Sequence, residues 1–237
     1  MRPGIVMLPS SHSDGPRSPG AATDTVTIET KDGLRLEGVV RDPDGEARGT
    51  AVICHAHPRF GGSKDHPVLW QTRIALARAG LAVLAFNFRG VMGSDGSFGG
   101  GTAEIEDARA AIGFIRGRAA GPTFVAGWSF GANVALRASL DDDRVAALAL
   151  LALPLGETSL DLPPIPESVV AYNRPVLLLA GDDDAYCPLP KLRDFASRLP
   201  TASVTVFEGT DHYFKGREQD AGDAVGRFAE GALFGDP

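Results

Sequence analysis

Short runs of apolar residues recur along the chain, with little polar alternation inside them. They are AVIC at 51–54, LAVLAF at 81–86, TFVAG at 123–127, ALALLAL at 147–153, VLLLAG at 176–181 and VTVF at 204–207. Strands that are covered on both faces of a sheet show this pattern, because neither face alternates with solvent. The runs therefore predict the central strands of a buried, mostly parallel sheet.

Segments with helical spacing lie between these strands. Apolar residues recur three or four positions apart in 69–77, 105–115, 133–140, 192–199 and 225–233. Strands that alternate with helices predict a right-handed, doubly wound α/β domain. The segment 155–174 breaks the rhythm, because it is rich in proline and poor in helical pattern. It is predicted to be a short irregular excursion, a minimal cap over one end of the sheet.

The N-terminal part of the chain differs from the rest. The β-rich segments 25–28 and 34–40 flank Lys31-Asp32-Gly33, and Asp-Gly between two such segments is typical of a hairpin. We therefore expect an antiparallel pair of strands before the parallel ones. Residues 1–22 are rich in Pro, Ser and Gly, and their one apolar run, Ile5–Leu8, is too short for a signal-peptide core. The prediction is a disordered tail over 1–22 and one domain over 23–237.

Composition and charge narrow the class of protein. The 237 residues carry a net charge of −7, which argues against nucleic acid or an anionic membrane surface as a partner. No apolar run approaches the ~20 residues that span a bilayer. Cys54 and Cys187 lie far apart in a chain that is long enough to bury a core without a disulfide. We expect reduced thiols and a cytoplasmic protein.

Ser129 stands between two glycines in the stretch FVAGWSFGAN at 124–133. The run TFVAG before it predicts a strand, and FGANVALRASL after it predicts a helix. A serine on such a turn can be a nucleophile, because the strained backbone lifts its hydroxyl above the sheet at a helix N-terminus. A side chain at Gly127 or Gly131 would collide with the neighbouring strand or helix. The alternative is an ordinary glycine–serine turn without chemistry.

A serine nucleophile needs a base, and the base needs a carboxylate that orients it. On a turn of this kind both follow the serine, in the order acid and then histidine, each just after a late strand. His212 follows the last predicted strand, and Asp182-Asp183-Asp184 follow the strand before it. His212 is therefore the predicted base. The order alone leaves both Asp182 and Asp184 open as the acid.

The loop at 54–63, after the first parallel strand, is rich in histidine and glycine. Acyl transfer needs two N–H donors for the developing oxyanion, one from the residue after the nucleophile, Phe130, and one from this loop. A metal site is the alternative, because His55 and His57 lie two apart with His66 nearby. No Cys, Asp or Glu completes a convincing ligand set there, so the sequence predicts no metal and no cofactor.

Taken together, several motifs resemble the α/β-hydrolase superfamily, and more narrowly its small, lidless, dienelactone-hydrolase-like bacterial serine hydrolases. They are HPRFGG at 57–62, FNFRG at 86–90, GSDG at 93–96, GWSFGA at 127–132, GDDDAYCP at 181–188 and DHYF at 211–214. The resemblance covers about residues 24–234. Its pattern Gly-x-x-Asp-x-x-x-Pro maps onto Gly181, Asp184 and Pro188, which implies Asp184 as the acid. It also implies the amide of Arg59 as the second oxyanion donor.

The resemblance implies a serine hydrolase that cleaves small carboxylic esters through an acyl-enzyme. Dienelactone hydrolases proper have a cysteine where this chain has Ser129, so a dienelactone substrate is not implied. The short segment 155–174 cannot build a large apolar tunnel, and short acyl chains are therefore expected. An amidase or peptidase with the same residues, and a non-catalytic ligand-binding protein on the same fold, are the alternatives, because a fold does not fix a function.

Overall fold

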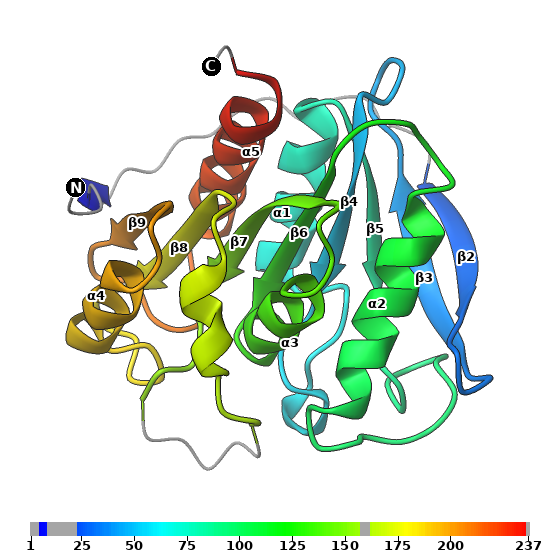
Figure 1. Ribbon diagram of the computed structural model, residues 1–237, viewed down its shortest axis with the longest axis horizontal. Helices are drawn as coiled ribbons and strands as arrows, with labels where there is room; N and C mark the ends of the chain where they lie inside the picture. The colour runs from blue at the N-terminus through cyan, green and yellow to red at the C-terminus, as the bar shows by residue number, and fades with distance from the viewer. Residues whose placement is uncertain (1–4, 9–22, 157–161, 236–237) are drawn as a thin grey trace.

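The computed structural model describes residues 5–8, 23–156 and 162–235, and the strands among them form one nine-stranded sheet (Figure 1). The strands are β1 (Ile5–Leu8), β2 (Thr23–Glu29), β3 (Arg35–Arg41), β4 (Gly49–Cys54), β5 (Leu81–Phe86), β6 (Thr123–Trp128), β7 (Val145–Leu151), β8 (Val176–Gly181) and β9 (Ala202–Phe207). The helices are α1 (Pro67–Arg78), α2 (Ala103–Ile115), α3 (Phe130–Ser139), α4 (Leu189–Ser197) and α5 (Glu218–Phe234), with 3-10 turns η1 (Pro58–Phe60) and η2 (Glu167–Ala171).

The strand order is β1-β9-β8-β7-β6-β4-β5-β3-β2. The strands from β1 to β5 in this order are parallel, whereas β3 is antiparallel to both β5 and β2. This confirms the predicted class, a mostly parallel sheet in which the antiparallel strands β2 and β3 precede the central parallel strands in the chain. The predicted hairpin turn is also confirmed, because Gly33 lies between β2 and β3 with a φ of 82°, which glycine adopts without strain.

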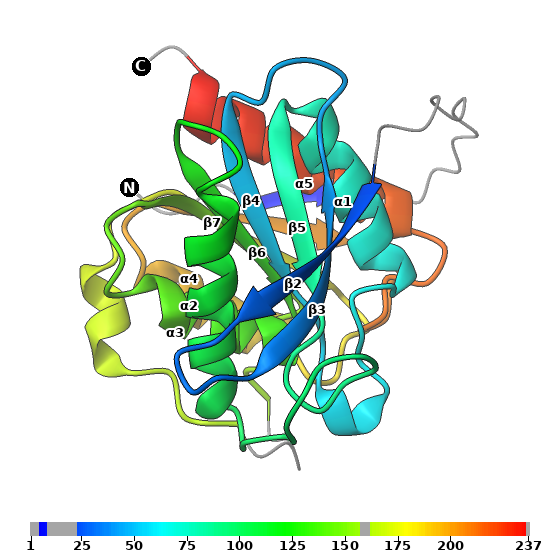
Figure 2. The same ribbon diagram turned by 90° about the vertical axis from the view of Figure 1, so that its right-hand side faces the viewer.

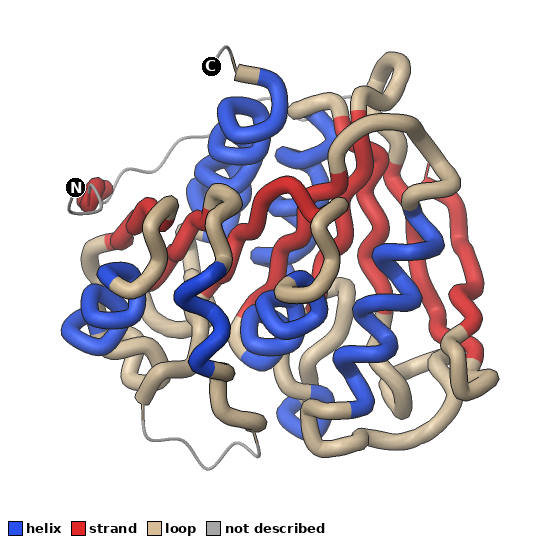
Figure 3. The backbone as a smooth tube through the Cα atoms, in the orientation of Figure 1, coloured by secondary structure: helices blue, strands red, loops and turns tan. Residues whose placement is uncertain are grey.

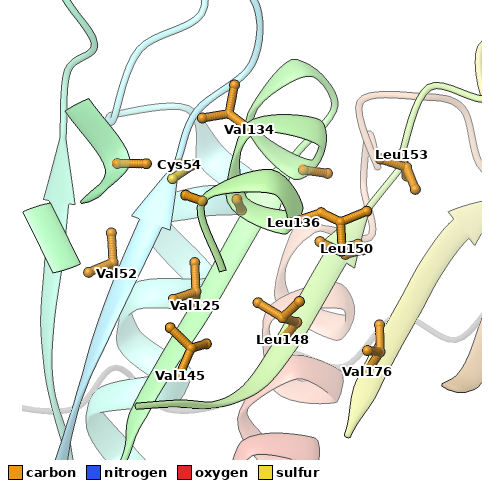
Figure 4. Close-up of a cluster of buried hydrophobic side chains, with 14 of the residues drawn as sticks. Val52, Cys54, Val125, Val134, Leu136, Val145, Leu148, Leu150, Leu153 and Val176 are labelled. Atoms are coloured by element: carbon orange, nitrogen blue, oxygen red, sulfur yellow. The ribbon is translucent and has the colours of Figure 1, made fainter. Parts of the chain in front are cut away.

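Helices cover both faces of the sheet. Figures 1 and 2 show α1 and α5 on one face and α2, α3 and α4 on the other. Strands β4, β5, β6 and β8 are buried along their whole length, which explains their unbroken apolar sequences. Figure 4 shows part of the core under α3, where Val134 and Leu136 lie above Val125, Leu148 and Leu150 of the neighbouring strands.

The N-terminal strand β1 corrects the prediction for the tail. Ile5–Leu8 are not disordered but pair in parallel with β9, from Ile5 opposite Val204 to Leu8 opposite Phe207. The edge of β9 would otherwise leave a row of backbone N–H and C=O groups unpaired, and a short apolar segment can satisfy them. The other residues of the predicted tail, 1–4 and 9–22, lie outside the described residues.

Helix α5 begins at Glu218, well before the predicted segment 225–233. Its first turns pack against α1 through glycines, since a Cβ on Gly222 would lie 2.7 Å from the backbone carbon of Gln71. A Cβ on Gly226 would lie 3.0 Å from the carbonyl oxygen of Ala75. The close contact between the two helices requires glycines, and glycines interrupt the apolar pattern that marks a helix. The sequence pattern therefore did not reveal the start of α5.

The segment 155–174 crosses the sheet end without a strand or an α-helix in its described part, where η2 is the regular element (Figure 3). The predicted irregular excursion is thus confirmed for residues 162–174, and 157–161 lie outside the described residues. Across 5–8, 23–156 and 162–235, no helix has both the length and the apolar character needed to cross a membrane.

Candidate active site

Ser129 lies on the predicted strand-to-helix turn, between the end of β6 at Trp128 and the start of α3 at Phe130. Its φ of 57° and ψ of −121° are strained for a residue with a side chain. The flanking glycines make this turn possible. A Cβ on Gly127 would lie 2.2 Å from the carbonyl oxygen of Gly131, and a Cβ on Gly131 would lie 2.3 Å from that of Cys54.

The structure brings Ser129, His212 and Asp184 together at the carboxyl edge of the sheet. The Nε2 atom of His212 lies 2.8 Å from Oγ of Ser129, and its Nδ1 atom lies 2.8 Å from Oδ2 of Asp184. The three residues follow β6, β9 and β8, and parallel strands end at the same edge. All three are buried, with 3% of Ser129, 3% of Asp184 and 8% of His212 exposed. The arrangement can carry a proton from the serine hydroxyl to the imidazole.

The turn after β8 selects one of the three consecutive aspartates. Oδ1 of Asp184 accepts hydrogen bonds from the amides of Tyr186 (2.8 Å) and Cys187 (3.1 Å), which directs Oδ2 to His212. Asp182 and Asp183 are exposed, and Oδ1 of Asp182 accepts only a long hydrogen bond, 3.4 Å, from the amide of Thr210. Of the two aspartates that the sequence order left open, Asp184 is thus the one that the backbone directs toward His212.

Trp128 contacts the backbone of His212. The indole Nε1 donates a hydrogen bond of 3.1 Å to the carbonyl oxygen of His212. The ring of His66 stacks on the indole at a centroid distance of 4.0 Å. These two contacts were not anticipated, although Trp128 lies inside the motif that identified Ser129. They hold the loop that carries the imidazole.

The predicted oxyanion donors have different surroundings. Phe130 is the first residue of α3, where backbone amides have no acceptor within the helix. The amide of Arg59, in contrast, donates a hydrogen bond of 3.1 Å to Nδ1 of His57. This bond commits the amide to another acceptor and counts against Arg59 as the second donor. Ala56 and His57, earlier in the same loop, line the pocket beside Ser129.

A pocket with a volume of about 150 Å³ opens above Ser129. It is lined by Ala56, His57, Phe60, Gly61, Gly62, His66, Trp128, Ser129, Tyr186, His212 and Tyr213. Phe60, Tyr186 and Tyr213 were not singled out from the sequence, although each lies in or next to a motif that was. They could have been found from the sequence because each lies within two residues of a predicted site residue, Arg59, Asp184 or His212.

The remaining histidines and the cysteines have structural surroundings. His55 is buried, its Nδ1 donates to the carbonyl of Ala56 (2.6 Å), and its Nε2 accepts from the amide of Phe88 (2.9 Å). Burial lowers the pKa of His55 to about 4, so its imidazole is neutral. Cys54 and Cys187 are free and buried, and burial raises the pKa of each thiol far above its usual range. Free thiols are therefore confirmed, and neither is an activated nucleophile.

No group of three or more His, Cys, Asp or Glu side chains that could hold a metal ion occurs among the residues that the structure describes. His57 accepts the hydrogen bond from Arg59 with Nδ1, and His66 stacks on Trp128, so the two histidines lie in different contacts.

Comparisons with known proteins identify the family of the fold. Residues 49–230 match a family model described as an alpha/beta hydrolase domain. An uncharacterized protein of Rickettsia prowazekii is 26% identical over 203 residues, which cover 81% of this chain and 82% of that protein.

Two solved structures are similar over most of the chain. A serine hydrolase without a lid from Xanthomonas campestris is 27% identical with a TM-score of 0.76, covering 94% of this chain and 100% of that one. A serine hydrolase homologue from Coxiella burnetii is 28% identical with a TM-score of 0.75, covering 86% and 96%. With this fold, and a family model that matches most of its length, the chain belongs to the alpha/beta hydrolase family.

Proposed function

We propose that the protein is a serine hydrolase that cleaves small carboxylic esters through an acyl-enzyme. The observation that carries the proposal is the continuous hydrogen-bonded series from Ser129 Oγ through His212 to Asp184, in which both distances are 2.8 Å. A free serine hydroxyl is a poor nucleophile, and a base within hydrogen-bonding reach activates it.

In the first half of the reaction, Oγ of Ser129 attacks the acyl carbon while Nε2 of His212 takes its proton. Asp184 stays ionised and accepts a hydrogen bond from Nδ1–H throughout, which keeps Nε2 available as an acceptor and stabilises the imidazolium. The tetrahedral oxyanion accepts hydrogen bonds from the amide of Phe130 and from an amide of the loop at 56–62. Ala56 and His57 of this loop line the pocket, whereas the amide of Arg59 is bonded to Nδ1 of His57.

In the second half, His212 gives its proton to the leaving alkoxide, and the alcohol departs. A water molecule then loses a proton to His212 and attacks the acyl-enzyme, and the second tetrahedral intermediate collapses as His212 returns that proton to Oγ of Ser129, which releases the carboxylic acid. No step requires a cofactor. A long peptide substrate is disfavoured because η2 is the regular element of the described residues 162–174 over the sheet end.

A fluorophosphonate tests the proposal directly, because only an activated serine displaces its fluoride readily. The protein should acquire one phosphonyl group, located on Ser129 by mass spectrometry of the labelled peptide. Ser129→Ala should abolish labelling, and His212→Ala should suppress it while the protein stays folded. Ser197→Ala, which removes an exposed hydroxyl on α4, is the matched control and should label like the wild type. A folded protein that is labelled elsewhere, or not at all, would contradict the proposal.

A further inference from the structure

Rings form most of the wall of the pocket above Ser129. Apart from Ser129 itself, the described lining residues without a ring are Ala56, Gly61 and Gly62. No carboxylate, ammonium or guanidinium group and no aliphatic side chain larger than a methyl group lines it within the described part of the chain. A site for flexible alkyl chains would be expected to carry leucine, isoleucine or valine, and a site for a charged group would need an opposite charge.

The rings fall into two groups that the reaction distinguishes. Tyr186, Tyr213 and Trp128 surround the imidazole of His212, with centroid distances of 4.8, 5.7 and 6.0 Å. The second group lies on the oxyanion loop, where the rings of His57 and Phe60 are 4.9 Å apart. The first group comes from the end of β6 and from the turns after β8 and β9, whereas the second comes from the loop after β4, and both line the pocket above Ser129.

Proton transfer decides which part of an ester meets which group. The leaving oxygen receives its proton from Nε2 of His212, so it must come within hydrogen-bonding distance of that atom. The alcohol portion is attached to this oxygen and therefore lies against the rings around His212. The carbonyl oxygen points the other way, toward the amide of Phe130 and the loop at 56–62.

The size and exposure of these rings fit a single aromatic group. The cavity volume of about 150 Å³ matches that of an engineered apolar cavity of about 150 Å³ that holds one benzene molecule. Tyr186 and Tyr213 are 40% and 54% exposed, so part of each ring faces solvent and is available to a ligand. Their backbone amides are bonded to Asp184 and Asp211, which fixes where the rings begin.

We propose that the enzyme selects esters whose alcohol portion carries an aromatic ring, such as benzyl esters of small acids. The inference rests on the proposed function, and it adds the side of the ester that is recognised. Offset or edge-to-face contacts between rings contribute beyond the area that they bury, whereas a saturated ring of the same size gains the burial alone.

The test compares benzyl acetate with cyclohexylmethyl acetate, which have the same acyl group, the same number of non-hydrogen atoms and a primary alcohol as leaving group. One to two ring contacts should raise kcat/KM for benzyl acetate by roughly 3- to 30-fold over cyclohexylmethyl acetate. In the mirrored pair, methyl phenylacetate and methyl cyclohexylacetate, the ring lies on the acyl side, and the ratio should stay below about 3.

Variants locate the preference. Tyr213→Leu and Tyr186→Leu should each lower the benzyl-to-cyclohexylmethyl ratio by about 2- to 10-fold, because each loses a ring but keeps an apolar side chain. Tyr213→Phe and Tyr186→Phe keep the ring and should keep the ratio. Phe114→Leu replaces an exposed ring on α2, outside the pocket, and should change neither ratio nor rate.

The outcomes separate this inference from the proposed function. A wild-type enzyme that labels with fluorophosphonate and hydrolyses both acetates equally, or prefers cyclohexylmethyl acetate, overturns the aromatic preference and leaves the serine hydrolase intact. A preference that appears only in the acyl-side pair overturns the assignment to the alcohol. Failure to label and to hydrolyse any of the four esters overturns both.

Discussion

Asp184→Asn tests how the turn after β8 controls the base. The carboxylate has two distinct oxygens, since Oδ1 accepts from the amides of Tyr186 and Cys187 and Oδ2 accepts from Nδ1 of His212. An asparagine with its NH₂ group toward the two amides would leave both donors without an acceptor, at about 1–3 kcal/mol for a donor that is buried, as that of Cys187 is. The carboxamide oxygen will therefore take the place of Oδ1, and the NH₂ group will face His212.

This orientation imposes the wrong tautomer on the imidazole. Nδ1 must then accept a hydrogen bond from the carboxamide, so the proton moves to Nε2, the atom 2.8 Å from Ser129 Oγ. A protonated Nε2 cannot accept the serine proton. To restore the productive tautomer, the asparagine must either lose the two hydrogen bonds from the amides of Tyr186 and Cys187 or place its NH₂ group against Nδ1–H. The imidazolium also loses its counter-charge. In the trypsin-type triad the same replacement lowers kcat about 10⁴-fold, which corresponds to about 5 kcal/mol.

The assay is kcat for p-nitrophenyl acetate, with thermal unfolding followed by circular dichroism. Asp184→Asn should lower kcat on the order of 10⁴-fold with a small change in Tm, because the two amide hydrogen bonds persist. Asp183→Asn, in the same turn but exposed, is the matched control and should stay within about threefold of the wild type. An Asp184→Asn enzyme that keeps more than about a tenth of its kcat would refute the tautomer argument.

The remaining predictions concern packing, charge and chain length. Gly131→Ala should destabilise the fold by several kcal/mol in urea titrations, since its Cβ would lie 2.3 Å from the carbonyl oxygen of Cys54. Gly113→Ala, in α2, places its Cβ in open space and should stabilise the fold by roughly 0.5–1 kcal/mol. The depressed pKa of His55 means that the unfolded chain binds its proton first as the pH falls from 6.5 to about 4. The free energy of unfolding should therefore decrease over that window, and His55→Gln should make the decrease less steep. Turnover of p-nitrophenyl esters should fall from four- to twelve-carbon acyl chains, and faster turnover of the longer ones would contradict the small pocket.

The sequence by itself determined the class of the fold and the positions at which chemistry could occur. Strands buried on both faces have unbroken apolar sequences, and this local signal located all six central strands. The turn at Ser129 was equally local, because the glycines that it requires lie within two residues of the serine. The order of an acid after β8 and His212 after β9 followed from the same turn type and from the strands that precede them, but it left Asp182 and Asp184 open.

Other features depend on contacts between segments that are distant in the chain. Residues of β1 pair with β9 across nearly the whole sequence, and nothing in four apolar residues specifies that partner. Arg89, which lies in the motif FNFRG, pairs with Asp107 of α2 at 2.7 Å and with Asp32 at 2.9 Å. Asp95, in the motif GSDG, pairs with Arg35 of β3. Charge patterns along the chain do not encode such pairs.

Within the site, the tertiary structure decided two details. The amides of Tyr186 and Cys187 distinguish Asp184 from Asp182, whereas the order of residues left both open. The side chain of His57 takes the amide of Arg59, which the resemblance had implied for the oxyanion. Both depend on the direction of single N–H bonds, and that direction is set by the folded backbone rather than by the residue types. The sequence thus determined which segments meet at the site, and the fold decided which atoms face one another.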